Sequence, residues 1–135
     1  LKTLSSGATG AMPQAALAEF IEGGGFDRQL RQARRTYAGL VARMSDEVAD
    51  AFPAECLMSR PQGGFVLWVE MPRQIDALEL HREAVSEGIA FVPGQLFSAS
   101  GRYRNCLRLN CGNIWSEAIE SGVRRLGELV TRRLG

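Results

Sequence analysis

One arginine of this sequence has the surroundings that a carboxylate-binding residue needs. Arg108 lies in the middle of the mainly apolar segment Cys106–Cys111, between Leu107 and Leu109. If the segment is a strand, its side chains alternate between two faces, so Arg108 points away from both leucines. A guanidinium on such a rigid element is suited to bind a carboxylate through two parallel hydrogen bonds. The pattern leaves open the alternative of a sheet-surface arginine in a structural salt bridge.

Two further segments combine turn residues with aromatic ones. Pro93-Gly94 directly follows a predicted strand and sets a tight turn. Phe97, just behind it, is an apolar loop residue that something should cover. In Pro61–Trp68, two glycines precede an aromatic strand, which lets the backbone approach another surface closely. The plain alternatives are a turn with a tucked-in aromatic residue and an ordinary hairpin entry.

Other kinds of chemistry find little support in the sequence. It contains no glycine-rich nucleotide loop, no GxSxG elbow and no HExxH pair. Lys2 is the only lysine and has no motif beside it, so we expect no catalytic amine in this chain. Three cysteines without a CxxC pair favour reduced thiols in a cytoplasmic protein. The one histidine, His81, lies in a predicted helix without a second close ligand pair, so we predict no metal site.

The composition is that of one ordinary globular domain. The chain has 135 residues, of which 45% are hydrophobic and 23% charged. Its net charge of +1 gives no general reason to expect nucleic acid or an anionic membrane as a partner. No apolar run approaches the roughly 20 residues that span a bilayer, and no signal peptide is visible. Because the chain opens on a loop-like segment, we expect a fragment whose natural start lies upstream.

The apolar spacing and the turn residues predict an α+β fold. Residues 26–52 carry apolar side chains at three- and four-residue steps, as expected for one long amphipathic helix. Further helices are predicted at 13–22, at 76–87 and from 116 onward, and strands at 65–69, 89–92, 106–111 and, more weakly, 55–58. We therefore predict a small, mostly antiparallel sheet of three to four strands, with helices packed on one face and a long helix before it.

Three motifs in this order resemble one known domain. PxGGFxxW at 61–68, PGxxF at 93–97 and LRL at 107–109, followed by a final helix, are similar to the C-terminal small domain of fold-type I aminotransferases, which depend on pyridoxal 5'-phosphate. The resemblance implies that Arg108 binds the substrate α-carboxylate and that Pro93, Gly94 and Phe97 line the site entrance. The Schiff-base lysine and the phosphate-binding loop of that family lie upstream of every matched position. The resemblance thus implies the cofactor for the parent protein, without covalent attachment to this chain.

The N-terminal part resembles a narrower group. Residues 13–21 together with 26–31 are similar to the MocR-type regulators of the GntR family, although Gln29 stands where their usual motif has His. Those regulators join a winged helix-turn-helix to an aminotransferase-like domain. The resemblance implies an amino acid or amine as ligand, DNA binding only through a missing N-terminal domain, and a homodimeric parent. Residues 1–25 would then link from the missing large domain, and residues 26–135 would form the small domain.

Three functions remain open at this stage. In the first, the parent is a regulator whose aminotransferase-like domain senses an amino acid. In the second, the parent is a catalytic class I or II aminotransferase that uses the same Arg108. The third alternative is an independent interaction module built on the amphipathic helices. It leaves the combination of PGxxF and LRL unexplained.

Overall fold

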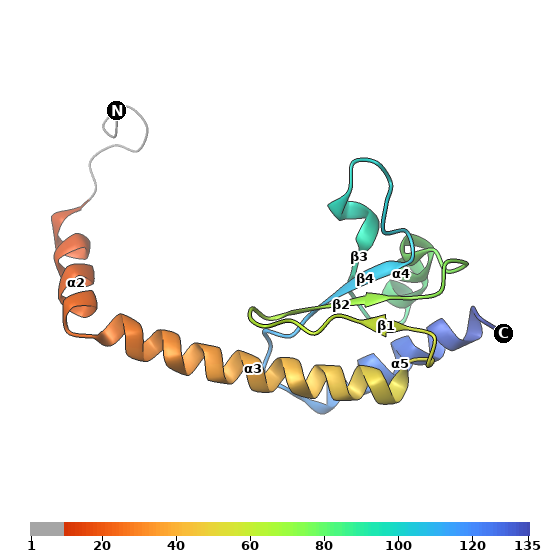
Figure 1. The fold of residues 1–135 in the computed structure, drawn as a ribbon, viewed down its shortest axis with the longest axis horizontal. Coiled ribbons are helices and arrows are strands. Elements are labelled where there is room, and N and C mark those ends of the chain that lie inside the picture. Colours follow the sequence, from red (N-terminus) through yellow and green to blue (C-terminus); the bar gives the residue numbers. More distant parts are fainter. Residues whose placement is uncertain (1–9) are drawn as a thin grey trace. The chain divides into compact units, whose positions relative to one another are not determined.

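Residues 10–135 are described by the structure, a computed structural model (Figure 1). The chain divides into two compact units, Leu1–Arg35 and Thr36–Gly135. In chain order the elements are the helices and strands α2 (Ala11–Glu22), α3 (Gly25–Ala51), β1 (Leu57–Met58), β2 (Val66–Glu70), α4 (Ala77–Ser86), β3 (Val92–Pro93), the 3-10 helix η1 (Gly94–Phe97), β4 (Cys106–Asn110) and α5 (Glu117–Arg132). The first nine residues lie outside the described residues. They include Lys2 and the start of the predicted linking segment 1–25.

The first unit contains α2 and the start of α3. Helix α2 begins two residues before Pro13, which therefore occupies the third helical position. The missing N–H of proline still costs nothing there, because the first four N–H groups of a helix have no intrahelical partner. The helix ends as predicted at the three glycines, where Gly24 has φ of +72°. A side chain at Gly25 would collide with the ring of Phe20, so this turn is tightly packed.

The second unit is built on a four-stranded sheet in the order β1-β2-β4-β3, and all its neighbouring strands are antiparallel. Leu67, Val69, Leu107 and Leu109 share one face of β2 and β4 and are at most 7% exposed. They pack with the buried residues of α3, α4 and α5 in a single core, so the helices cover one face of the sheet (Figure 1). The predicted α+β class, with a long helix ahead of a small antiparallel sheet, is confirmed.

Local sequence signals explain how two of these helices start and how they pack. Asp76 caps α4 by accepting hydrogen bonds from the N–H groups of Leu78 and Glu79, at 2.9 and 3.2 Å, as the predicted cap requires. Ser116 caps α5 by accepting one hydrogen bond, from the N–H group of Ile119 at 3.4 Å. Within α5, a side chain at Gly127 would collide with the carbonyl oxygen of Ala51, so this glycine allows α5 to approach the end of α3 closely.

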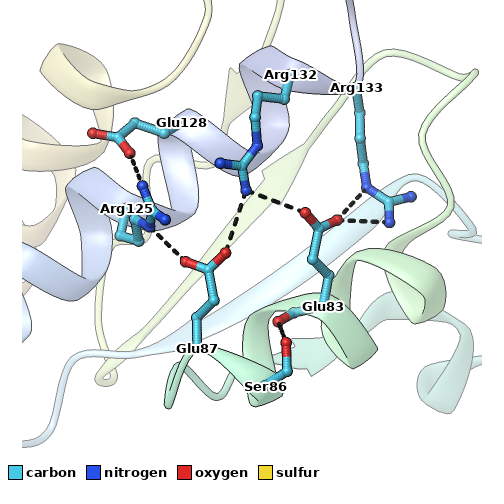
Figure 2. Close-up of polar contacts among 7 residues, drawn as sticks. All are labelled: Glu83, Ser86, Glu87, Arg125, Glu128, Arg132 and Arg133. Atoms are coloured by element: carbon cyan, nitrogen blue, oxygen red, sulfur yellow. Dashed lines mark hydrogen bonds and ion pairs between the residues drawn. The ribbon is translucent and has the colours of Figure 1, made fainter.

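Helices α4 and α5 are also joined by charged side chains (Figure 2). Glu83 accepts hydrogen bonds from Arg133, at 3.1 and 2.9 Å, and from Arg132 at 3.2 Å. Glu87 accepts from Arg125 at 2.5 Å and from Arg132 at 3.3 Å. We call these five residues the α4–α5 ion-pair network. In it Arg132 bridges the two glutamates, so the two helices are linked at several points.

No helix within residues 10–135 has the length and apolar character needed to cross a membrane.

Candidate carboxylate-binding site

Arg108 lies on the sheet face opposite the helices. It stands directly across from Trp68 on β2 and from Val92 on β3, while its neighbours Leu107 and Leu109 face the core. This is the orientation that the alternation of apolar residues predicts. The guanidinium carbon of Arg108 lies 4.6 Å from the centre of the Phe97 ring, close enough for a cation–π interaction.

The guanidinium of Arg108 has an unused donor. Its Nε is buried and has no hydrogen-bond partner among residues 10–135. The same described residues supply no carboxylate that pairs with Arg108, so they contain no structural salt bridge of the kind that the sequence left open. A buried donor without a partner is rare in folded proteins and calls for an explanation, such as a ligand.

Phe97 reaches Arg108 because the PGxxF segment folds back over β4. The sequence predicts a strand at 89–92 and then a tight turn, but the pairing covers only Val92–Pro93, and Gly94–Phe97 forms a 3-10 helix. A side chain at Gly94 would collide with the carbonyl oxygen of Tyr103 and lie 2.9 Å from Cβ of Cys106. Glycine is therefore required for this close approach, which brings Phe97 against Arg108. Pro93 pairs with Leu107, and Gly94 packs against Tyr103 and Cys106.

Two further aromatic residues, Trp68 of the PxGGFxxW motif and Tyr103, lie beyond Phe97. The Trp68 ring meets that of Phe97 at 5.7 Å and that of Tyr103 at 5.4 Å, both in edge-on arrangements. We call Trp68, Phe97 and Tyr103 the aromatic cluster. The sequence marks Trp68 only as part of a strand motif. Tyr103 lies in a loop where nothing in the sequence marks it.

Asp76 ties the loop around Tyr103 to helix α4. Besides capping the helix, it accepts hydrogen bonds from Gln95 at 3.0 Å and from Arg104 at 3.1 and 2.8 Å. Burial acts to raise the pKa of Asp76, but the hydrogen bonds from Arg104 and from the helix N–H groups outweigh burial and lower the pKa overall. The charged carboxylate thus connects η1, the loop and α4.

The PxGGFxxW segment contributes only Trp68 to the site. Gly64 has φ of +81°, a conformation that favours glycine. A side chain at Gly63 or Gly64 would meet nothing within 4 Å, so the described residues make no close approach to these glycines. Phe65 packs instead against Tyr37, with ring centres 5.3 Å apart.

The histidine and the cysteines lie in packed or partly packed surroundings. His81 stands edge-on to Phe91 with ring centres 5.1 Å apart. The cysteines Cys56, Cys106 and Cys111 are free. Burial, and next the charge of Glu55, raise the pKa of Cys56 to about 11. Within residues 10–135, no three His, Cys, Asp or Glu side chains come together as metal ligands would.

A cavity of about 370 Å³ lies away from Arg108, between the end of α3 and β1. Its lining is mostly apolar and includes Val48, Phe52, Met58 and one charged residue, Arg60. No residue of the PGxxF or LRL motifs lines this cavity, so it is not part of the candidate site around Arg108.

The small antiparallel sheet with helices on one face and Arg108 on the other is consistent with the small domain of an aminotransferase. The chain belongs to the family described as aminotransferase class I and II, which it matches over residues 2–126. Among solved structures it is similar to LysN, the alpha-aminoadipate aminotransferase of Thermus thermophilus complexed with N-(5'-phosphopyridoxyl)-L-leucine. The TM-score is 0.83 at 34% identity, over 98% of this chain and 34% of that one.

Curated relatives are of two kinds. The HTH-type transcriptional regulator YjiR of Escherichia coli (strain K12), itself uncharacterized, is 38% identical over 90% of this chain. The 2-aminoadipate transaminase of Thermus thermophilus is 40% identical over 76% of this chain. In each case the match covers 26% of the relative, so the chain spans about a quarter of the length of these proteins.

The described residues do not fit covalent attachment of pyridoxal phosphate. That attachment needs a lysine amine, and none of residues 10–135 is a lysine. What they offer is an arginine donor with aromatic surroundings, which suits a carboxylate-bearing molecule rather than the cofactor's aldehyde.

Proposed function

We propose that this chain is the carboxylate-binding end of an aminotransferase-like effector domain in a GntR/MocR-type transcriptional regulator. The observation that carries the proposal is the buried, unpartnered Nε of Arg108, on a rigid strand and against Phe97. In this proposal Arg108 binds the α-carboxylate of an amino acid, and Pro93, Gly94 and Phe97 line the entrance. The similarity to the helix-turn-helix regulator YjiR over 90% of the chain favours a regulator as the parent.

We further propose how this chain belongs to its parent protein. The parent protein binds pyridoxal 5'-phosphate through residues outside 10–135, and the cofactor, when bound, supplies the electron sink of amino-group chemistry. The parent is a cytoplasmic homodimer and contacts DNA only through its N-terminal domain. Residues 1–25 connect the larger domain to the small domain formed by residues 26–135.

The second candidate is a catalytic class I or II aminotransferase. The 40% identity to a 2-aminoadipate transaminase favours it. The two candidates differ in turnover. A regulator is expected to change its affinity for DNA when an amino acid binds, without sustained amino transfer, whereas steady amino transfer to a 2-oxo acid by the full-length protein would favour the enzyme.

Arg108→Ala in the full-length protein tests the carboxylate clamp common to both candidates. We expect amino-acid binding to weaken by about 2–5 kcal/mol, because a desolvated charge pair is lost, while cofactor absorbance stays unchanged. Arg108→Lys keeps the charge but not the two-pronged geometry and should recover only part of the affinity. Binding is measured by calorimetry, with Arg82→Ala on the exposed face of α4 as the control. Unchanged affinity in Arg108→Ala would mean that the carboxylate is held elsewhere.

A further inference from the structure

Arg108 is surrounded by aromatic side chains that remain open to solvent. Phe97 is 44% exposed and Tyr103 is 42% exposed, although both belong to the aromatic cluster. Exposed aromatic side chains grouped on one face commonly mark a binding surface. The aromatic cluster is therefore a candidate contact surface for a ligand of Arg108.

The cluster is continuous with the guanidinium of Arg108. Phe97 lies 4.6 Å from the guanidinium carbon, Trp68 follows at 5.7 Å from Phe97, and Tyr103 at 5.4 Å from Trp68. Trp68 is also the direct cross-strand neighbour of Arg108 in the register of β2 and β4. A molecule whose carboxylate pairs with Arg108 would therefore have these rings within reach.

The backbone at Tyr103 gives an independent indication. Tyr103 is the only non-glycine residue of the described part of the chain with a positive φ, +64°. A bulky residue seldom adopts this conformation, and it persists only where its surroundings impose it. Here the Tyr103 carbonyl oxygen accepts a hydrogen bond from the Cys106 N–H at 3.1 Å and lies against Gly94, while the next residue, Arg104, is paired with Asp76. Strained backbone of this kind concentrates at functional sites.

The charges around the cluster restrict the ligand further. Arg102 lies over the Tyr103 ring at 5.5 Å and Arg108 over the Phe97 ring, so both flanks of the cluster are cationic. A second positive charge on the ligand would be repelled. A flat, uncharged ring would instead gain edge or face contacts with the aromatic side chains.

We infer that Trp68 and Tyr103 are specificity-determining residues, which make the Arg108 site selective for carboxylates that bear an aromatic side chain. The inference rests on the proposed carboxylate-binding role of Arg108 and adds a selection by side chain. Phe97 holds the guanidinium, and Trp68 and Tyr103 contact the ring of the ligand. The competing explanation is that the cluster merely closes the outer face of the sheet.

The test uses three inert probes on the full-length, cofactor-loaded protein. These are 3-phenylpropionate, propionate and 3-phenyl-1-propanol, none of which has an amino group to transfer. Equilibrium binding is measured by calorimetry. We expect 3-phenylpropionate to bind at least about tenfold more tightly than propionate, because it adds aromatic contacts and buried area, and 3-phenyl-1-propanol to bind more weakly than 3-phenylpropionate.

Variants separate recognition from folding. Tyr103→Gly removes the ring while suiting the positive φ, so it should fold and should reduce the preference for 3-phenylpropionate over propionate to less than about threefold. Tyr103→Phe should keep the preference. Trp68→Leu should reduce the preference in the same way. Trp115→Leu, at a tryptophan that contacts Arg43 instead, is the matched control and should leave it intact.

The outcomes distinguish this inference from the proposed function. Equal binding of 3-phenylpropionate and 3-phenyl-1-propanol would overturn the carboxylate role of Arg108 and this inference with it. A carboxylate requirement without any preference for the aromatic acid would overturn this inference alone. A preference for 3-phenylpropionate that survives both Tyr103→Gly and Trp68→Leu would also overturn this inference alone. If none of the three probes bound, both proposals would be overturned.

Discussion

At the scale of single residues, Gly94 decides where the side chains around Arg108 can lie. A methyl group on Gly94 would strike the Tyr103 carbonyl oxygen and crowd Cys106, and neither of these groups is the free end of a flexible side chain. The η1 segment would have to lift away from β4, taking Phe97 with it. The geometry of the candidate site thus depends on a residue that contributes no functional group.

Gly94→Ala should therefore lower the free energy of unfolding by roughly 1–3 kcal/mol, the usual cost of overpacking. Gly39→Ala is the control, because Gly39 lies in the interior of α3 with nothing within 4 Å of the added methyl group. That variant should gain roughly 0.5–1 kcal/mol from helix propensity. Urea denaturation of both variants measures the effects, and a stabilised Gly94→Ala would contradict the close approach.

At single positions, the sequence predicted the features that follow from side-chain alternation in strands and from turn residues. The outward orientation of Arg108 follows from Leu107 and Leu109, because a strand has a period of two. The position of Tyr103 could not be predicted. Tyrosine has no preference for the positive φ that it adopts here. The close approach of its carbonyl oxygen to Gly94, nine residues earlier in the chain, depends on the tertiary fold.

At the scale of elements, the helices were predicted more closely than the short strands. Caps such as Asp76 and Ser116 are local signals, so they can be read from the sequence. The strand predicted at 89–92 is shorter in the structure because Ile89, its first predicted residue, hydrogen-bonds to the end of α4. The Ile89 N–H donates to the Ala84 carbonyl oxygen at 2.9 Å, directly after Gly88, which has φ of +77°. This hydrogen bond belongs to the helix end and is not available to the sheet.

The α4–α5 ion-pair network makes stability depend on pH. The hydrogen bond from Arg133 is the main cause that lowers the pKa of Glu83, against a smaller opposing effect of burial. A carboxylate with a lowered pKa contributes stability that is fully present above the ordinary pKa of glutamate, about 4.3. That stability is lost as the pH falls through the lowered value in the folded protein.

Glu83→Gln should lower the free energy of unfolding by about 0.5–1 kcal/mol at pH 7, because these side chains are partly exposed and such pairs are weak. The difference from the unsubstituted chain should shrink below about pH 4 and in 1 M salt. Urea denaturation at several pH values measures it, with Asp46→Asn on the exposed side of α3 as the control. A difference that is the same at every pH would exclude the charge as its source.

At the scale of the whole molecule, the two units differ in what they bury. Every buried hydrophobic residue among those described belongs to Thr36–Gly135, from Val41 to Val130. Helix α2 has no buried residue. Since buried apolar area is the main favourable term in folding, the described residues place the main source of folding stability in the second unit.

A chain of residues 36–135 should therefore unfold in one cooperative transition, with a free energy of unfolding within about 1 kcal/mol of that of the full 135-residue chain. The new start is favourable because Thr36 would stand ahead of the remaining turns of α3, and threonine is a good N-cap residue. Urea denaturation followed by tryptophan fluorescence checks this, since both Trp68 and Trp115 remain in the shorter chain. If the shorter chain lost its cooperative transition, residues 1–35 would have to stabilise the core in a way that its burial does not reveal. In that case the two units would fold as one.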